Sequence, residues 1–217
     1  MRRLVVVVTA VAGLVMACAQ PPPVRTETYA GADTRGIDVR KLAIAPFRTA
    51  DSFEAVGGRD LSGREAALLV ERFVSEALTA RGVEVVPAGD VRTALRIDDP
   101  ELALPPPAIV ARVVSQEFGA PAVLYGTVYR MRERGGEAIG SAIPASVWFE
   151  VSLVRAPGGA LLWKAVFNET QQPLGDNVLR ARRYPGGGTR WLRAEELARW
   201  GARELAAGFP TGAVGEP

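Results

Sequence analysis

The stretch Ser146–Arg155 reads SVWFEVSLVR and alternates between apolar and polar side chains from end to end. Because successive side chains of a strand point to opposite faces, this pattern predicts a strand with one buried face. Pro157-Gly158-Gly159 predicts a turn. A second alternating run follows, with its apolar positions at Leu161, Trp163, Ala165 and Phe167. The two runs predict an antiparallel hairpin, to which the other elements can be added.

Upstream of the hairpin, the chain predicts a strand, a helix and a second strand. Lys41–Phe47 (KLAIAPF) and Val83–Val86 are short apolar runs, as in interior strands. Between them, Ser62 and Glu65 form a capping box, and Gly82 ends the helix. The apolar residues of this helix recur at steps of three and four: Ala66, Leu69, Val70, Phe73, Val74, Ala77 and Leu78. The pattern predicts a β-α-β crossover.

Three more helices and one more strand complete the prediction. We expect a short helix capped by Asp90, a helix starting at Pro107, a strand over Ala122–Met131 and a last helix over about Arg193–Ala207. Arg193 lacks the side-chain acceptor of a good N-cap. Residues 48–61, 132–145 and 171–190 are expected as loops. The order β-α-β-α-α-β-β-β-α predicts an α/β fold of the mixed α+β kind, with a single mixed sheet and helices packed on it.

The N-terminus has the features of an export signal. Arg2 and Arg3 precede the apolar run Leu4–Ala17, which is shorter than the roughly 20 residues of a membrane-spanning helix. Val15-Met16-Ala17-Cys18 resembles the bacterial lipobox. The resemblance implies cleavage after residue 17, a lipid thioether on Cys18 and an acyl chain such as palmitate on the new amino group. An ordinary signal peptide with an incidental cysteine is the alternative.

The expected domain plan follows from this anchor. Residues 1–17 are the signal peptide, 18–38 a Pro-, Gly- and Thr-rich flexible tether, 39–210 a single domain and 211–217 a disordered tail. Such a tether spans roughly 25 Å as a flexible chain and about 70 Å when fully extended. Ala19 follows the cysteine, and the resemblance to enteric sorting signals then implies the outer rather than the inner membrane.

The composition removes most enzyme chemistry. The chain has no histidine and one cysteine, so Ser-His-Asp and Cys-His arrangements and imidazole metal ligands are excluded. We predict no cofactor and no metal site. Without Arg2 and Arg3 the 26 basic residues fall to 24, equal to the acidic ones, which argues against nucleic-acid binding. The adjacent pairs Asp98-Asp99 and Glu195-Glu196 are the visible candidate acids and bases, and structural roles are expected for both.

A basic run precedes the last helix and is the candidate partner-binding site. It consists of Arg180, Arg182, Arg183, Arg190, Trp191 and Arg193. A solvated loop is one interpretation, and contact with lipid phosphate or an acidic partner is the other. Tyr184, Trp191 and Trp200 are expected to pack in the core, with a partner surface as the alternative. Arg130, Arg132 and Arg134 are expected to share one solvated face.

Several segments together resemble a known group of proteins. They are KLAIAPF, VEVVPAGDV, EFGAPAVLYGTVYRM, VWFEVSLVRAPGGALLWKAVFNETQQPL and RAEELARWGARELAAGFP. Over about residues 40 to 209, the chain resembles bacterial envelope lipoproteins with a domain like the N-terminal domain of the Tol translocation protein. The curli secretion lipoprotein family and the lipoprotein activator of penicillin-binding proteins share that architecture. FNETQQPL and the last helix look most like a narrower group of periplasmic lipoproteins.

The resemblance implies a function in the cell envelope. We expect a membrane-anchored, non-catalytic binding or assembly module whose domain lies in the periplasm and whose partner is another envelope protein, with a peptidoglycan synthase as one candidate. An oligomer is left open. A subunit of an outer-membrane secretion pore is an alternative, but residues 132–145 are too short and too glycine-rich for an added barrel hairpin. A carboxylate-dependent enzyme is the third hypothesis.

Overall fold

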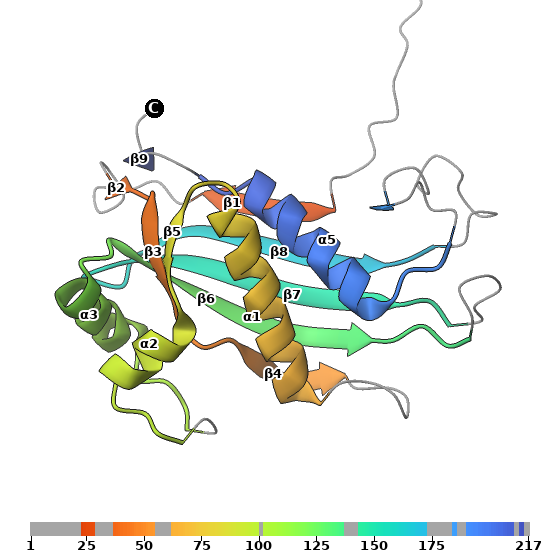
Figure 1. Cartoon of the computed structure of the whole chain (residues 1–217), viewed down its shortest axis with the longest axis horizontal. Helices are drawn as coiled ribbons and strands as arrows, with labels where there is room; N and C mark the ends of the chain where they lie inside the picture. Colours follow the sequence, from red (N-terminus) through yellow and green to blue (C-terminus); the bar gives the residue numbers. More distant parts are fainter. Residues whose placement is uncertain are drawn as a thin grey trace, which may run out of the picture.

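The computed structural model describes residues 23–28, 37–54, 62–99, 102–136, 143–172, 184–185, 190–210 and 213–214. Seven strands form one sheet in the order β1-β8-β7-β6-β3-β5, with β4 also paired to β6 (Figure 1). The pairs β1·β8, β8·β7 and β7·β6 are antiparallel, whereas β3 is parallel to β5 and β6, and β4 is parallel to β6. The strands are β1 (Val24–Thr28), β3 (Lys41–Ile44), β4 (Arg48–Glu54), β5 (Glu84–Val86), β6 (Ala122–Arg132), β7 (Ser146–Arg155) and β8 (Leu161–Thr170).

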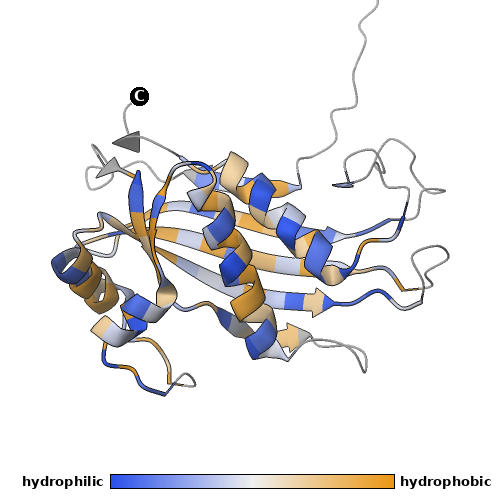
Figure 2. Cartoon of the chain, in the orientation of Figure 1, coloured by the Kyte–Doolittle hydropathy of each residue, from blue (hydrophilic) through white to orange (hydrophobic). Residues whose placement is uncertain are grey.

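In the described parts of the chain, four helices pack on this sheet. The helices α1 (Gly63–Thr79) and α5 (Ala194–Ala207) lie side by side across one face (Figure 1). The larger core fills the space below them and includes Phe73, Phe149 and Phe167. Blue, hydrophilic segments remain on the outward side of both helices (Figure 2). The helices α2 (Ala88–Ala94) and α3 (Pro107–Phe118) close a smaller core at one end of the sheet.

The predicted fold class is confirmed. The chain forms a mixed α/β structure with one mixed sheet, and the β-α-β crossover and the β7–β8 hairpin are both present. The capping box of α1 is also confirmed. The Glu65 carboxylate accepts the Ser62 N–H at 2.9 Å, and Ser62 Oγ accepts the Glu65 N–H at 3.3 Å.

Two segments expected to be irregular are strands, which corrects the sequence-based prediction. Val24–Thr28, inside the expected tether, forms the edge strand β1, and Arg48–Glu54, inside the expected loop 48–61, forms β4. Neither segment carries an alternating apolar pattern, because few of its side chains face the core. Val24 is a buried residue of β1, whereas Arg25, Thr26 and Glu27 are exposed.

Smaller differences occur at the ends of elements. The short helix begins at Ala88 behind Pro87, not at Asp90. Near the chain ends, β2 (Ile37–Asp38) pairs with β9 (Ala213–Val214), which lies within the expected tail. None of the helices in the described ranges is long and apolar enough to cross a membrane. The expected signal peptide and Cys18 lie outside the described residues.

Candidate interaction surface

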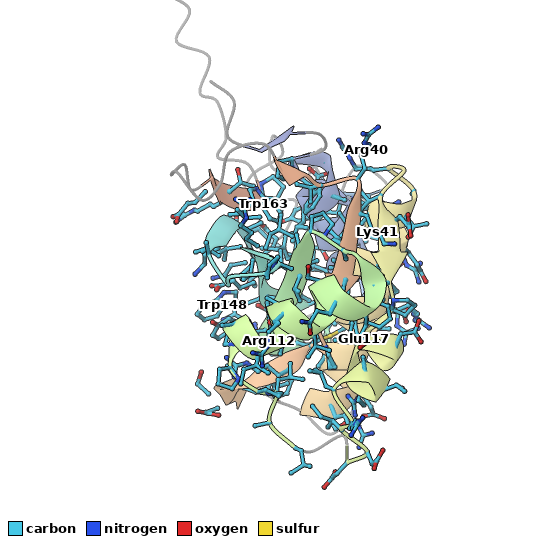
Figure 3. All side chains as sticks on the ribbon, turned by 90° about the vertical axis from the view of Figure 1, so that its left-hand side faces the viewer. Arg40, Lys41, Arg112, Glu117, Trp148 and Trp163 are labelled. Carbon is cyan, nitrogen blue, oxygen red and sulfur yellow. The ribbon has the colours of Figure 1, made fainter. Side chains whose placement is uncertain are left out.

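Among the described residues, one face of the sheet is covered only at its end. The helices α1 and α5 cover the opposite face, and α3 reaches the near end of this one, where the Tyr125 hydroxyl donates to the Pro107 carbonyl at 3.4 Å. Figure 3 looks at the molecule from the α2–α3 end and shows Trp148 on the side away from α1. We call the remaining surface the open face. Its residues are Thr127, Tyr129, Arg130, Arg132, Trp148, Glu150, Ser152, Lys164, Val166 and Asn168, all half-buried or exposed.

An aromatic pair stands on the open face. The rings of Tyr129 and Trp148 stack with their centroids 4.5 Å apart and an angle of 18° between the planes. Tyr129 reaches this face together with its neighbour Arg130, because the β6–β7 register shifts between Val128 and Arg130. A β-bulge of this kind turns successive side chains away from strict alternation.

The guanidinium of Arg130 extends the aromatic pair across the sheet. It lies 5.8 Å from the centre of the Trp148 ring, and its Nη2 donates to Asn168 Oδ1 at 2.7 Å. The arrangement joins β6, β7 and β8 in one row, since Arg130, Trp148 and Asn168 are cross-strand partners. The indole Nε1 of Trp148 is shielded from solvent and has no hydrogen-bond acceptor among the described residues. A stacked aromatic pair with an arginine is the composition that dominates binding energy at protein interfaces.

The next rows of the open face carry an ion pair. Lys164 Nζ lies 2.8 Å from Glu150 Oε1, and both side chains are partly shielded from water. Val166 lies beside Glu150 on the neighbouring strand. The centre of the open face is therefore nearly neutral, and its aromatic pair lies toward the end of the sheet where β6 finishes.

Arginines occur toward that same end on both sides of the sheet: Arg132 is paired with Ser146 on the open face, and Arg190 and Arg193 lie beside the start of α5. Glu133 joins the two sides: one carboxylate oxygen accepts the Ala194 N–H at 3.2 Å, and the other accepts the Arg134 N–H at 3.0 Å. Arg132 Nε and Arg134 Nη1 are shielded from solvent and have no hydrogen-bond acceptor among the described residues.

The segment that leads into α5 is fixed by polar contacts. Gln171, just after β8, donates from Nε2 to the Arg190 carbonyl at 2.9 Å and accepts the Leu192 N–H at 2.6 Å. Arg190 Nη1 donates to Glu196 Oε2 at 2.8 Å, with a second bond between the same two side chains. The hydrogen bond from Arg190 lowers the pKa of Glu196 to about 2, and the same bond raises the pKa of Arg190.

The candidate residues from the sequence divide between described and undescribed parts of the chain. Arg180, Arg182 and Arg183 lie outside the described residues. Arg190, Trp191 and Arg193 lie beside the start of α5, whereas Arg130 and Arg132 follow one another on the open face, as the sequence predicted. The role of the candidate residues in partner binding stays a prediction.

The other aromatic residues of the basic run pack as expected. Tyr184 and Trp200 are buried, with their ring centroids 5.4 Å apart, and the Tyr184 hydroxyl donates to Glu169 Oε1 at 2.6 Å. Core packing is confirmed for these two residues. Trp191 is half-buried.

The candidate acids Glu195 and Glu196 have structural contacts. Glu195 pairs with Arg199 at 3.4 Å, and Glu196 pairs with Arg190. Glu71 is a half-buried carboxylate that the sequence did not single out, and its partial burial raises its pKa. It accepts the Phe47 N–H at 2.9 Å, so it fixes the turn between β3 and β4. Within the described ranges, no three His, Cys, Asp or Glu residues gather closely enough to hold a metal ion.

Comparison with known proteins gives structural likenesses alone. No family model matches the chain, and no curated protein matches it. A solved PelC dodecamer from Paraburkholderia phytofirmans is 17% identical over 83% of this chain and 96% of that chain, with a TM-score of 0.44. The C-terminal domain of LpoB from Escherichia coli is 17% identical over 65% and 88%, with a TM-score of 0.41. Lipoprotein GNA1162 from Neisseria meningitidis is 20% identical over 61% and 81%, with a TM-score of 0.39.

Proposed function

We propose that the chain is a lipid-anchored, non-catalytic binding module of the bacterial cell envelope, and that its open face binds another envelope protein. The stacked Tyr129–Trp148 pair beside Arg130 carries this proposal. A sheet face left without a covering helix is stable in water when its side chains are polar. This face instead presents a half-buried tryptophan. A partner that excludes water from the tryptophan ring gains much of its binding free energy there.

The anchor is the second part of the proposal, and it rests on the sequence. Cys18 follows an apolar run of signal-peptide length and is the only cysteine of the chain. Several acyl chains hold a protein at a membrane far longer than one chain, because each buried methylene contributes about 0.8 kcal/mol. A module held in this way meets partners by diffusion along the membrane surface.

The anchor is tested by metabolic labelling with a fatty acid. We expect the label in the wild-type chain, its absence from Cys18→Ala, and release of that variant from the membrane fraction. A Cys18→Ala chain that carries the label or stays in the membrane fraction would overturn the anchor.

The binding surface is tested by photo-crosslinking in intact cells. A photoreactive amino acid at Asn168, an exposed residue of the open face, should give one discrete adduct with a protein. The matched position is Leu68 on the outward side of α1, which is 50% exposed and should give none. Trp148→Ala should reduce the Asn168 adduct about tenfold or more, the effect of removing an interface hot spot. Equal adducts from both positions, or an Asn168 adduct that Trp148→Ala leaves unchanged, would overturn the open face as the binding surface.

A further inference from the structure

We infer that the outer edge of β1 pairs with the same strand of a second copy, so that two chains form one continuous antiparallel sheet. The pairing is two-fold symmetric and is centred on Thr26. It leaves the open face of each copy available to the proposed envelope partner.

The two edges of the seven-stranded sheet differ in how well they can accept a further strand. At one edge, β5 has three residues, and β4 shifts its register with β6 between Thr49 and Glu54. Short and irregular strands protect a sheet edge. At the other edge, all five residues of β1 pair with β8 without a shift, and no strand of the described ranges pairs with its outer side (Figure 1). The outer edge of β1 is therefore the regular one.

The outer side of β1 is also exposed. Val24 is buried and fixes the strand on the core, whereas Arg25, Thr26 and Glu27 are exposed. In a strand that is paired on one side, alternate N–H and C=O groups point outward without a partner in the sheet. Such groups bind a further strand by main-chain hydrogen bonds, the arrangement known as β-augmentation.

The sequence of β1 favours a second copy as the added strand. Val24–Thr28 reads VRTET, with one basic and one acidic residue placed symmetrically about Thr26. When two such strands run antiparallel with Thr26 opposite Thr26, Arg25 of each copy lies opposite Glu27 of the other. Opposite charges in directly opposed positions stabilise an antiparallel pair, and so do pairs of threonines.

The neighbouring symmetric registers are less favourable. Centring the pair on Arg25 places this arginine opposite its own copy, and centring it on Glu27 does the same for the glutamate. Like charges in directly opposed positions destabilise the pair. In addition, residues 21–23 are prolines, which have no N–H for a sheet ladder, so regular pairing ends at Val24. The register centred on Thr26 is the one that pairs all five residues of both strands.

The symmetry fixes how the two domains lie. Residues that oppose each other across an antiparallel pair point to the same side of the sheet, so the two-fold axis is perpendicular to the joined sheet. Both copies of α5, which packs over β8 and β1, therefore lie on one side. Both open faces lie on the other side, where an envelope partner meets two stacked Tyr129–Trp148 pairs on one surface.

The lipid anchor of the proposed function favours this pairing, and this one step rests on it. Five paired residues make a small interface, so association in dilute solution is weak. Two chains held on one membrane meet at a much higher effective concentration. Six residues lead from Cys18 to Val24 and reach at most about 20 Å. The two Val24 residues lie about 15 Å apart in the joined strands, so both anchors can reach the same membrane.

The test uses the full-length chain in cell envelopes and one introduced cysteine. Thr26→Cys places two thiols opposite each other, where the Cα atoms of antiparallel partners are about 4.5–5.5 Å apart, within the range of a disulfide. Mild oxidation should link this variant into a covalent dimer. The matched controls are Asp98→Cys, at an exposed site beyond α2, and the unsubstituted chain, whose only thiol is Cys18. Both controls should remain monomeric.

Charge reversal in the Thr26→Cys chain tests the register. Arg25→Glu places two pairs of like charges across the joined strands and should lower the ratio of dimer to monomer about tenfold. Glu27→Arg should act in the same direction. When the two variants are expressed together with different tags, opposite charges face each other again, and the mixed dimer should exceed both uniform dimers. A defect in folding would not be rescued in this way.

A second pair of variants replaces Thr26→Cys if that chain fails to fold. In a mixture of Arg25→Cys and Glu27→Cys chains, the disulfide should join one variant to the other, and neither variant should link to itself. A link of Arg25→Cys or Glu27→Cys to its own kind would show a different register and would overturn the inference.

Three further results would overturn it: a Thr26→Cys chain that stays monomeric, a cross-link that charge reversal leaves unchanged, or an adduct with another protein in place of the dimer. The fatty-acid label separates the pairing from the anchor. Labelled protein without the Thr26→Cys dimer refutes the pairing and leaves the anchor standing. Unlabelled protein refutes the anchor, and oxidation of Thr26→Cys in concentrated solution then decides the pairing.

Discussion

The carboxylate of Glu133, one residue beyond β6, accepts the backbone N–H of Ala194, the first residue of α5, at 3.2 Å. This contact supplies from another element the N-cap that Arg193 cannot give. The Glu196 carboxylate accepts the Arg193 N–H at 2.9 Å and completes the helix start. A helix N-terminus with two carboxylates is also favoured by the helix dipole.

Replacing Glu133 should therefore destabilise the domain. We expect Glu133→Ala to lower the free energy of unfolding by about 1 kcal/mol, the usual effect of losing an N-cap acceptor. Glu133→Gln keeps an acceptor oxygen and should lose less. Urea unfolding of both variants gives the comparison, and equal stability of Glu133→Ala and the wild type would contradict the cap.

The Arg190–Glu196 pair should make part of the stability depend on pH. The pKa of Glu196 is lowered from 4.5 to about 2 in the folded chain, so the contribution is complete above about pH 5 and is lost as the pH falls toward 2. The side chains of Arg190 and Glu196 are 47% and 35% exposed. Solvent therefore screens the pair and reduces its contribution to the free energy of unfolding to about 1 kcal/mol. Glu196→Gln should be less stable than the wild type by this amount at pH 7 and equally stable at pH 2. A difference that stays constant with pH in unfolding curves would refute the assignment.

Two glycines in helices should respond in opposite directions to the same change. A Cβ on Gly201 of α5 would lie 2.7 Å from the Phe167 ring, whereas a Cβ on Gly89 of α2 meets nothing within 4 Å. Gly201→Ala should cost about 1–3 kcal/mol through overpacking. Gly89→Ala should stabilise by about 0.5–1 kcal/mol, because alanine favours the helix. Thermal unfolding measures both, and a stabilising Gly201→Ala would contradict the close packing of α5 on β8.

Neighbouring aromatic residues of β7 should separate binding from stability. Phe149 is fully buried, and Phe149→Ala should cost about 3–5 kcal/mol. Trp148 lies on the open face, and Trp148→Ala should cost only about 1 kcal/mol, mainly the stacking with Tyr129. Circular dichroism during urea unfolding gives these values. A cost for Trp148→Ala as large as that for Phe149→Ala would make this tryptophan a core residue and remove its part in binding.

The sequence predicted the elements whose side chains fill the core. The alternation in β7 and β8 and the apolar face of α1 are strong sequence signals, because each of these elements buries many residues at a regular spacing. Strands β1 and β4 were missed because an edge strand needs few buried side chains, and their pairing depends on β8 and β6 instead of on a local pattern.

The surface was harder to predict than the core. The alternation along β7 predicted that Trp148 and Phe149 lie on opposite faces of the sheet. Which of the two faces stays uncovered depends on where α3 packs. The bulge that brings Tyr129 beside Trp148 arises from the β6–β7 pairing. The cap on α5 comes from Glu133, far away in the chain, so no local signal near Arg193 could reveal it.

The pairing of β1 with β8 imposes an order in time on the assembly of the sheet. A chain is synthesised from its N-terminus, so Val24–Thr28 exists well before Leu161–Thr170 can receive it. Contacts between segments so distant along the chain close late in folding. During that interval the first strand offers an unsatisfied backbone edge to any extended polypeptide nearby. A chain that stops before residue 161 keeps that edge permanently, and this makes incomplete products prone to aggregate.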